Sequence, residues 1–325
     1  MAFERRILGE TEIRLLVTGG AGFIGSHLAC ALLKKGHSVI LLDNFSSGRR
    51  ENLAGLERAE LVEGDVRDFE SLGRLCKGAD SVFHLAAVVS VLNSIEDPQG
   101  TWEVNLKGTY NILETARREK IRRLVFISSS AVYGEYPQLP FKESLPPQPE
   151  SPYALSKLAG EQLCSLYARL FGLETVALRL FNVYGPRQNP FSQYASAIPN
   201  FTRRLLTGER PTIYGDGRQT RDFVYIDDVV RALESASQSK KGSGQVFNIG
   251  SGKRLSVNKL FAEIQTILQT NAQPEYSPRK KGDVLQTWAD LSRAKRVLGF
   301  APKANFAKSL RETVLWFKES VIFAK

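Results

Sequence analysis

A tyrosine and a lysine four residues apart, Tyr153 and Lys157 in the segment YALSK, are the pair in this sequence best suited to proton transfer. Side chains at that spacing lie on one face of a helix, which predicts a phenol beside an ammonium group. A free tyrosine has a pKa of about 10 and is a poor base at neutral pH. Because a nearby positive charge favours the phenolate, we expect the pKa of Tyr153 to be lowered and Tyr153 to act as a general base.

Three consecutive serines, Ser128, Ser129 and Ser130, end an apolar run in the segment FISSSAVYG. Doubly wound parallel sheets build their sites at the carboxyl ends of their strands. A serine hydroxyl at such an end can hydrogen-bond the reacting oxygen of a substrate. The position of the run leaves open which of the three serines does so.

A glycine-rich turn stands near the start of the chain, with Gly19, Gly22 and Gly25 in LLVTGGAGFIGSHLA. An apolar run precedes it and a helical pattern follows it, as in dinucleotide-binding loops. In such loops glycine permits a tight turn, close approach of the backbone to a pyrophosphate, and close packing of helix on strand. The sequence therefore predicts a bound dinucleotide.

Acidic residues at the ends of the next two predicted strands refine this prediction. Asp43, in ILLDN, is placed to bind a ribose diol, and its charge would repel a 2′-phosphate, so NAD is favoured over NADP. Arg49 and Arg50 follow it, and we expect them in solvent. Asp65, expected at the end of the third strand in EGDVRD, is placed to accept a hydrogen bond from the adenine amino group.

Strands that alternate with helices must position these groups. Through residues 13–129, β-branched or leucine-rich runs alternate with helical patterns, one of them a long helix over 101–120. This alternation predicts an α/β fold with a doubly wound parallel sheet of Rossmann type. The second half predicts a helix over 151–172, a strand over 174–185 and a loop over 186–200.

The chain of 325 residues is long enough to form two cores, and we expect it to cross between two domains more than once. The NAD-binding domain is predicted over 1–182 and 222–254. A smaller α/β domain, predicted over 183–221 and 255–325, is expected to bind the substrate.

Composition limits the class of protein. The chain is 42% hydrophobic and 24% charged with a net charge of +10, which fits a globular protein with an anionic ligand. Basic residues occur in scattered short pairs, so nucleic-acid binding is not expected. No apolar run reaches the roughly 20 residues of a membrane span and no signal peptide is recognisable, so we expect a cytoplasmic protein. The three cysteines form no metal-binding motif.

Over nearly its whole length the sequence resembles the extended short-chain dehydrogenase/reductases, and among them the NAD-dependent nucleotide-sugar epimerases and dehydratases. The resemblance lies in TGGAGFIGSHL, LLDNFSSG, GDVRD, FHLAA, NLKGTYNILE, SSSAVYG, SPYALSKLAGE, LRLFNVYGPRQ, GDGRQTRDFVYIDD, FNIGSG and KGDVLQTWAD. It implies a tightly held NAD and a nucleoside-diphosphate sugar that binds beneath a C-terminal cap. Because the chain is most similar to epimerases of UDP-sugars, the expected nucleotide is UDP. The resemblance also implies a homodimer paired through the helices of 101–118 and 153–170.

The resemblance implies a role for each matching residue. Tyr153 would be the base. Its spacing from Tyr153 makes Ser129 the serine expected to act with it, and Ser130 is close enough to share that role. Asn182 would lie beside the diphosphate and Arg221 would clamp it, a bidentate task that suits arginine. The matching cofactor positions are Gly19, Gly22, Phe23, Ile24, Gly25, Asp43, Asn44, Asp65, Val66, Leu85, Ala86, Ala87, Asn105, Tyr153 and Lys157. The matching substrate positions are Ser90, Ser129, Asn182, Ala197, Phe201, Tyr214, Arg221, Lys280, Asp283 and Thr287.

Single positions in the sequence indicate the type of reaction. Dehydratases of this family carry an Asp-Glu pair where this chain has Ser130 and Ala131, so dehydration is disfavoured. The chain is most similar to the UDP-glucose and UDP-N-acetylglucosamine 4-epimerases, which implies C4 epimerisation through a transient 4-keto sugar. Thr287 stands where a bulky tyrosine would exclude a 2-N-acetyl group, so acetylated hexoses are expected substrates beside glucose and galactose. The alternative is a small residue with no gating role.

Two positions depart from the family pattern. Lys280, beside Arg279, replaces an arginine of the second diphosphate clamp, and lysine binds phosphate only as a point charge. Val89 stands where many UDP-galactose epimerases carry a lysine that contacts the cofactor. The chain is therefore less similar to that branch than to the epimerases of acetylated sugars or to C5-type and decarboxylating relatives. The alternatives are a UDP-glucuronate epimerase or decarboxylase, another nucleotide-sugar dehydratase or reductase, or a non-catalytic NAD-sensing or RNA-associated scaffold.

Overall fold

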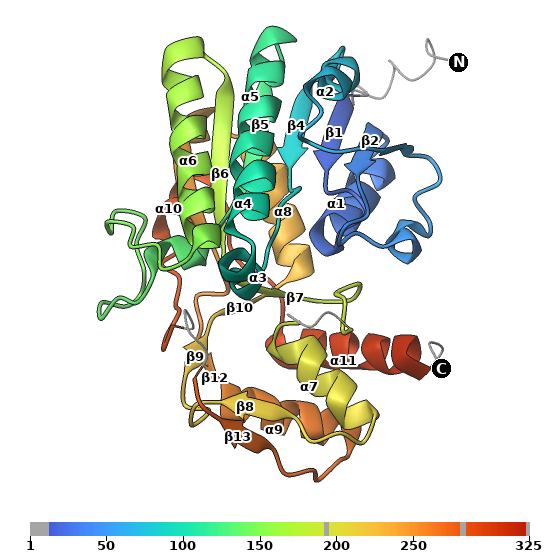
Figure 1. Ribbon diagram of the computed structural model, residues 1–325, viewed down its shortest axis with the longest axis vertical. Helices are drawn as coiled ribbons and strands as arrows, with labels where there is room; N and C mark the ends of the chain where they lie inside the picture. Colours follow the sequence, from blue (N-terminus) through green and yellow to red (C-terminus); the bar gives the residue numbers. More distant parts are fainter. Residues whose placement is uncertain (1–12, 192–194, 280–283, 323–325) are drawn as a thin grey trace.

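The computed structural model describes residues 13–191, 195–279 and 284–322. A seven-stranded sheet, parallel at every pairing, forms the centre of the larger domain (Figure 1). The predicted doubly wound parallel sheet is confirmed. Across the sheet the strands are β11 (Gln245–Ile249), β6 (Glu174–Leu180), β5 (Arg123–Ser129), β4 (Ser81–His84), β1 (Arg14–Thr18), β2 (Ser38–Asp43) and β3 (Glu60–Glu63).

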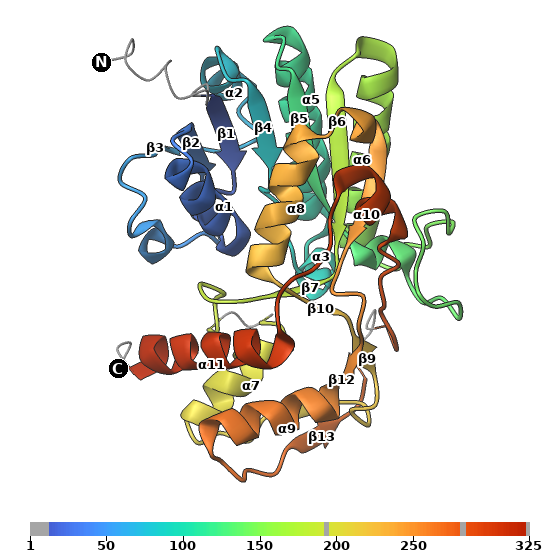
Figure 2. The same cartoon turned by 180° about the vertical axis from the view of Figure 1, so that it is seen from behind.

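Side chains of the central strands alternate between two hydrophobic clusters, one on each face of the sheet. In β1, Leu15 and Val17 belong to one cluster and Leu16 to the other. Burial on both faces explains why these strands are almost wholly apolar. One face is covered by α1 (Phe23–Lys34) and α8 (Ile226–Gln238), and the other by α2 (Phe69–Cys76), α5 (Gly108–Arg118) and α6 (Pro152–Phe171) (Figures 1 and 2). No helix in the described ranges is both long and apolar enough to cross a membrane.

The helix that carries Tyr153 and Lys157 is α6, and its sequence explains both of its ends. Ser151 caps the amino end by accepting a hydrogen bond from the Ala154 N–H, and a proline occupies the first helical position. Gly172 ends the helix with a φ of +70°, a conformation that glycine adopts without strain. The predicted helix over 151–172 is confirmed.

The helix predicted over 101–120 is interrupted. It begins as α4 (Pro98–Trp102), passes through a π-helical turn, η3 (Glu103–Lys107), and continues as α5. Asn105 lies in the π turn, and its hydrogen bonds to a distant loop and helix, described below, are not visible in the local sequence. Turns of this kind are frequent at functional sites. Other short helices are η2 (Arg50–Leu53), α3 (Val91–Glu96), η4 (Ser130–Tyr133) and η5 (Lys240–Gly242).

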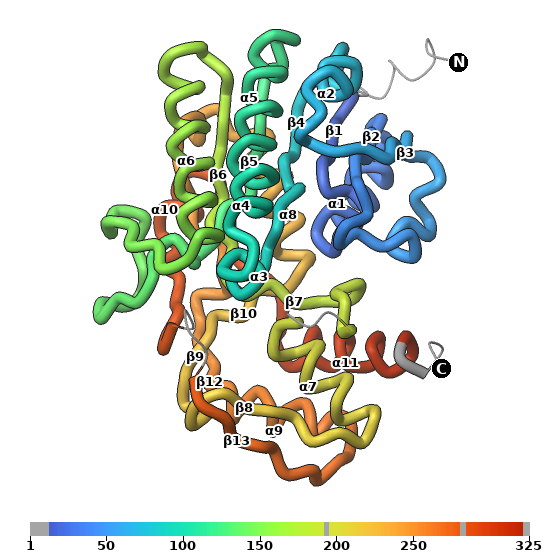
Figure 3. The backbone as a smooth tube through the Cα atoms, viewed as in Figure 1, coloured from blue at the N-terminus to red at the C-terminus, as the bar shows by residue number. Residues whose placement is uncertain are grey.

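The strand predicted over 174–185 is two strands in different sheets. β6 ends in the main sheet, and β7 (Asn182–Tyr184) pairs in parallel with β10 (Phe223–Tyr225). The N–H of Asn182 donates to the carbonyl of Asp222, 3.0 Å away. The backbone passes here from the main sheet toward the smaller domain (Figure 3).

The smaller domain consists of helices and of strands of only two or three residues. These are α7 (Ala197–Leu206), β8 (Thr212–Tyr214), β9 (Thr220–Arg221), β12 (Leu255–Ser256), α9 (Val257–Leu268), β13 (Glu275–Ser277) and α11 (Phe306–Ile322). β8 pairs in parallel with β13, and β9 antiparallel with β12. The loop predicted over 186–200 is shorter than expected, because α7 begins inside it. Phe201 packs edge-on against Phe261, with ring centres 5.6 Å apart, in the core beneath α7.

The division of the chain into domains at 182, 222 and 254 stays a prediction. The helix α10 (Ser292–Leu298) lies within the part of the chain assigned to the smaller domain. It nevertheless packs against α8 and β11 of the larger domain (Figure 2). The chain therefore returns to the main sheet before it forms α11.

Candidate active site

The glycine turn between β1 and α1 is close-packed. Gly19 has a φ of +72°, and a Cβ there would lie 2.9 Å from the backbone N of Ala86. A Cβ on Gly25 would lie 2.1 Å from the carbonyl oxygen of Gly19. Gly22 precedes α1 and offers no side-chain cap, so the first N–H groups of α1 are left for an anion. Phe23 and Ile24 open α1, both half-buried.

Asp43, at the end of β2, holds this turn in place. One carboxylate oxygen accepts from the Ala21 N–H at 2.9 Å, and the other accepts from the Phe45 N–H at 2.9 Å. The side chain of Asn52 donates to the carbonyl of Ala21 at 2.9 Å. Both backbone groups of Ala21 are therefore fixed, one by a predicted residue and one by a residue that the sequence did not single out.

Asp65 lies beyond the end of β3, which stops at Glu63, so the prediction that Asp65 and Val66 end that strand is wrong. The Arg67 guanidinium donates to both oxygens of Asp65, at 2.9 and 2.8 Å, and Asn44 donates at 2.8 Å. These bonds, that of Arg67 first, lower the pKa of Asp65 to about 2. Asp65 is therefore ionised at any working pH.

The loop that follows β4 lies against the glycine turn. Its residues Leu85 and Ala86 donate backbone hydrogen bonds to the Thr18 hydroxyl, both at 3.2 Å, and half-buried Ala87 follows them. Asn105 holds the same loop by accepting from the Val88 N–H at 2.7 Å and donating to the Val88 carbonyl at 2.9 Å. The loop then ends at Ser90, whose hydroxyl caps α3 by accepting from the Asn93 N–H.

Tyr153, Lys157 and Ser129 converge at the carboxyl edge of the sheet. Tyr153, in the first turn of α6, is only 9% exposed, and the Ser129 side chain is close enough to its phenol to lower the pKa of Tyr153. The Lys157 ammonium donates to the Ile127 carbonyl at 2.9 Å and lies 6.0 Å from the centre of the Tyr153 ring. The predicted phenol–ammonium neighbourhood is present.

The three serines differ in their contacts. Ser128 donates its hydroxyl proton to Glu161 and is buried. Ser129 lies beside the phenol of Tyr153 and accepts from the Ala131 N–H at 3.1 Å. Ser130 follows as the first residue of η4. Ser129 is thus the serine that contacts the phenol, while Ser128 is engaged elsewhere.

Burial has the largest effect on the phenol of Tyr153. It raises the pKa of Tyr153, and the hydrogen bond with Ser129 acts in the opposite direction. Burial also lowers the pKa of Lys157 to about 8. The prediction of a lowered pKa for Tyr153 is wrong for the protein alone, because the phenol loses its water while the ammonium of Lys157 is directed at a carbonyl.

Three predicted substrate residues lie where the chain crosses between domains. Thr287, 5% exposed, donates to the side-chain oxygen of Asn182 at 3.4 Å and accepts from the Asp222 N–H at 3.3 Å. Arg221, in β9, donates to the carbonyls of Thr220 and Leu285 at 2.9 and 3.3 Å. Segments more than 60 residues apart in sequence are therefore neighbours here.

The remaining predicted substrate residues are spread through the smaller domain. Ala197 is half-buried at the start of α7, Phe201 belongs to the core, and Tyr214 ends β8. Lys280 and Asp283 lie outside the described residues.

A buried ion pair lies behind Lys157 and was not predicted. Arg179 of β6 donates to both oxygens of Glu161 of α6, at 2.9 and 2.7 Å, and both side chains are 4% exposed. The guanidinium also lies 4.6 Å from the centre of the Tyr133 ring. A charged residue inside the apolar run LRLF was the available signal, since a buried charge requires a partner.

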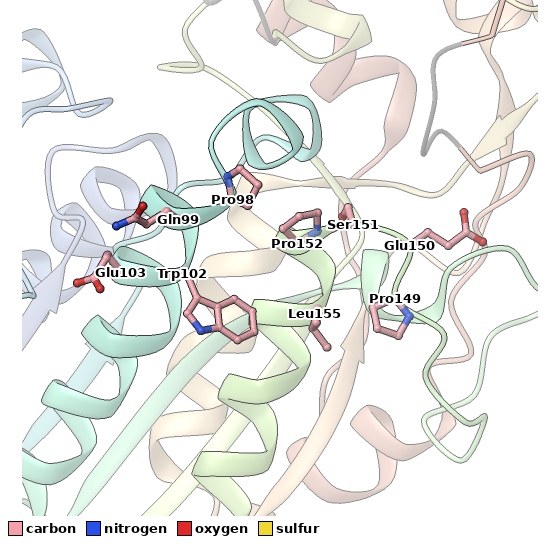
Figure 4. A pocket seen from close by; sticks show the side chains of 9 residues that line it. All are labelled: Pro98, Gln99, Trp102, Glu103, Pro149, Glu150, Ser151, Pro152 and Leu155. Atoms are coloured by element: carbon pink, nitrogen blue, oxygen red, sulfur yellow. The ribbon is translucent and has the colours of Figure 1, made fainter.

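The pocket drawn in Figure 4, with a volume of about 520 Å³, lies between α4 and the amino end of α6. None of the predicted site residues lines it. Its lining residues are Pro98, Gln99, Trp102, Glu103, Pro149, Glu150, Ser151, Pro152 and Leu155.

Comparison with known proteins shows the family to which this chain belongs. The model of the NAD dependent epimerase/dehydratase family matches residues 15–250. The UDP-glucose 4-epimerase of Mycolicibacterium smegmatis is 40% identical over 311 residues, 94% of this chain and 99% of that one. The UDP-N-acetylglucosamine 4-epimerase of Methanobrevibacter ruminantium, solved with UDP-N-acetylmuramic acid, is 38% identical with a TM-score of 0.91, over 96% of this chain and 100% of that one. The UDP-glucuronic acid 4-epimerase of Bacillus cereus, solved with UDP-glucuronic acid and NAD, is 35% identical with a TM-score of 0.89, over 95% and 100%.

Proposed function

Because this chain belongs to the NAD-dependent epimerase/dehydratase family, we propose that it inverts C4 of a UDP-hexose through a transient 4-keto sugar. The observation that carries the proposal is the convergence of Tyr153, Ser129 and Lys157 at the carboxyl edge of the sheet, beside the loop that covers the glycine turn. Doubly wound sheets bind their ligands at this edge.

The residues present fit NAD. Gly19 and Gly25 leave backbone surface that a Cβ would cover, and the amino end of α1 suits a pyrophosphate. Asp43 and Asp65 would meet the ribose and the adenine. When bound, NAD supplies a reversible hydride acceptor.

The protein residues divide the remaining work. Tyr153 removes the proton of the sugar O4 and later returns it, while Ser129 donates a hydrogen bond to the same oxygen. The Lys157 charge favours the phenolate form. Since both faces of the keto sugar must be presented, Asn182 and Arg221 would hold the substrate by its diphosphate, where binding does not depend on the orientation of the sugar.

The proposed sugars are UDP-glucose and UDP-galactose together with their 2-N-acetyl counterparts. Support comes from Thr287, a residue smaller than tyrosine, whose hydroxyl donates to the side-chain oxygen of Asn182. Replacing Thr287 by tyrosine should abolish turnover of the acetylated sugars while UDP-glucose is still converted. If both sugar types survive that change, Thr287 has no gating role.

A homodimer is proposed through α5 and α6, which lie side by side in Figure 1. Support comes from exposed apolar side chains on this face of α4, α5 and α6, and from the pocket at its edge. The side chains are Trp102, Tyr110, Leu155, Leu170 and Phe171. Sedimentation of the protein and of Leu155→Arg tests this, because a charge in a two-fold interface meets its own copy. A cytoplasmic location also stays a prediction.

The experiment that decides the reaction is incubation of the purified protein with UDP- and dTDP-linked sugars, without added cofactor. We expect isomers of equal mass from UDP-hexoses. Loss of water would indicate a dehydratase, loss of carbon dioxide from UDP-glucuronate a decarboxylase, and an isomer of UDP-glucuronate alone the glucuronate epimerase. No product from any sugar would contradict the proposal.

A further inference from the structure

A buried histidine connects two threonines beneath the site. His84, the last residue of β4, is 1% exposed. Its Nδ1 lies 2.8 Å from the Thr18 hydroxyl, at the end of β1, and its Nε2 lies 3.0 Å from the Thr109 hydroxyl, in α5. Nothing in the proposed chemistry uses this side chain, although it reaches both sides of the site.

The direction of each proton in this chain follows from the contacts at its ends. Thr109 donates its one hydroxyl proton to the Asn105 carbonyl at 2.6 Å, so it can only accept from His84. Nε2 of His84 therefore carries a proton. Burial, aided by the charge of Lys157, lowers the pKa of His84 to about 3, so the ring is neutral and Nδ1 accepts from the Thr18 hydroxyl.

One end of the chain fixes the cofactor loop. With its proton given to His84, the Thr18 oxygen is free to accept, and it receives the N–H groups of Leu85 and Ala86. The backbone N of Ala86 is the atom that a Cβ on Gly19 would meet. The Leu85 N–H also donates to the Thr18 backbone carbonyl, 3.1 Å away, so it is the Ala86 contact that depends on the Thr18 hydroxyl, whose orientation His84 sets.

The other end fixes the π turn and, through it, the catalytic helix. Asn105, whose carbonyl receives the Thr109 proton, donates to the Ser156 hydroxyl at 3.0 Å while it holds both polar groups of Val88. Ser156 in turn donates to the carbonyl of Tyr153 at 2.7 Å. The line of hydrogen bonds ends on the residue that carries the proposed base.

We propose that His84 is a positioning residue, which holds the cofactor loop 85–88 and the first turn of α6 in one fixed arrangement. Its effect on turnover rests on the proposed epimerase function, whereas its effect on NAD binding does not. A hydrophobic residue could fill the same space, but it would leave both threonine hydroxyls without their partner in the interior. Displacements of about 1 Å between reacting groups can lower a rate by roughly a hundredfold.

The test compares two threonines. Thr109→Val removes the hydroxyl that links His84 to Asn105. Thr175→Val removes an equally buried hydroxyl that donates to the Cys164 carbonyl at 2.7 Å, at the opposite end of the sheet. Each variant loses a buried hydrogen bond to a helix carbonyl, and Thr109→Val also loses the bond from His84, so its melting temperature should fall further than that of Thr175→Val.

The two variants are distinguished by their affinity for NAD, measured by calorimetry on the nucleotide-free protein. The inference predicts a dissociation constant at least about threefold higher for Thr109→Val than for Thr175→Val, because the loop loses its fixed position. With a UDP-hexose, kcat should fall at least about tenfold while KM stays within about twofold, since the geometry of reaction changes and not the sugar contacts. A smaller difference in the dissociation constant overturns the inference.

Two conservative changes keep the inference testable if Thr109→Val does not fold. His84→Gln can still donate toward Thr109 and loses the contact with Thr18, whereas His84→Asn can still accept from Thr18 and loses Thr109. Because the inference requires the hydrogen bonds of His84 to both Thr18 and Thr109, each variant should bind NAD at least about threefold more weakly than the unchanged protein. Unchanged affinity in either variant overturns the inference. Failure of the unchanged protein to convert any UDP-sugar would refute the proposed function and leave this binding result intact.

Discussion

The two sides of the site differ in how their polar groups are held. On the cofactor side, Asp43, Asp65 and Asn105 are already hydrogen-bonded to neighbouring backbone or side chains. On the sugar side, Asn182 and Thr287 are brought together from distant parts of the chain, at the crossing between the domains. The first set is fixed by contacts around one edge of a sheet, and the second depends on how two domains meet.

This difference suits a reaction in which the cofactor stays and the sugar turns. A cradle whose donors and acceptors are preorganised binds its ligand with little loss of entropy. An intermediate that must present both faces requires a pocket that does not fix it in one orientation. Changing one residue at a time should therefore separate the two sides.

The largest effect is expected where the two sides meet. Tyr153→Phe removes the proton acceptor for O4, and kcat should fall by roughly 10²–10⁴-fold with little change in NAD or UDP-sugar affinity. Tyr167→Phe, which removes another hydroxyl of α6 that contacts Glu114, is the matched control and should stay active. Residual kcat above about one tenth would show that Tyr153 is not the base.

A change confined to the cofactor side comes next. Gly19→Ala places a Cβ 2.9 Å from the Ala86 nitrogen at a positive φ, so NAD affinity should fall about tenfold or more. Gly36→Ala is the control, since Gly36 also has a positive φ, +82°, but nothing within 4 Å of its Cβ. Equal loss of NAD affinity in both would mean that strain alone, rather than the packed turn, determines binding.

A smaller effect is expected on the sugar side. Arg221→Lys keeps the charge but loses the planar pair of donors, so KM for the UDP-sugar should rise by about tenfold. NAD affinity should not change. Arg218→Lys, at a side chain 88% exposed, should leave KM as it is. A fall in NAD affinity with Arg221→Lys would contradict the separation of the two sides.

The smallest expected effect is a dependence on pH. The Lys157 ammonium is present below its pKa of about 8 and is lost as the pH rises through that value. Because burial raises the pKa of Tyr153, the phenolate gained above pH 8 offsets the ammonium lost, so kcat/KM should rise by about fivefold from pH 7 to 8 and then stay level. Melting curves over the same range serve as the control for unfolding. A kcat/KM that keeps rising between pH 8 and 10 would mean that the charge of Lys157 does not matter.

The parts of the molecule that the sequence predicted are those set by local pattern. The apolar runs of β1 and β2, the caps of α6 and the spacing of Gly19, Gly22 and Gly25 each depend on residues close in sequence. The Tyr153–Lys157 pair follows from helical spacing for the same reason.

The parts that escaped prediction depend on contacts between distant segments. The π turn is held by Asn105 bonding to Val88 and Ser156, and the strand over 174–185 divides because Asn182 pairs with a segment 40 residues later. The direction of the pKa shift at Tyr153 depends on how fully the phenol is buried, which no local pattern reveals. The roles assigned to individual cofactor and substrate residues stay predictions.

The measurement that tests the central claim most directly uses UDP-galactose labelled with deuterium at C4, converted in ordinary water. If the hydrogen at C4 leaves as a hydride and returns to the same carbon, the UDP-glucose formed should retain all of its deuterium at C4. Loss of the label to solvent would contradict the account, because the hydrogen would then have left as a proton.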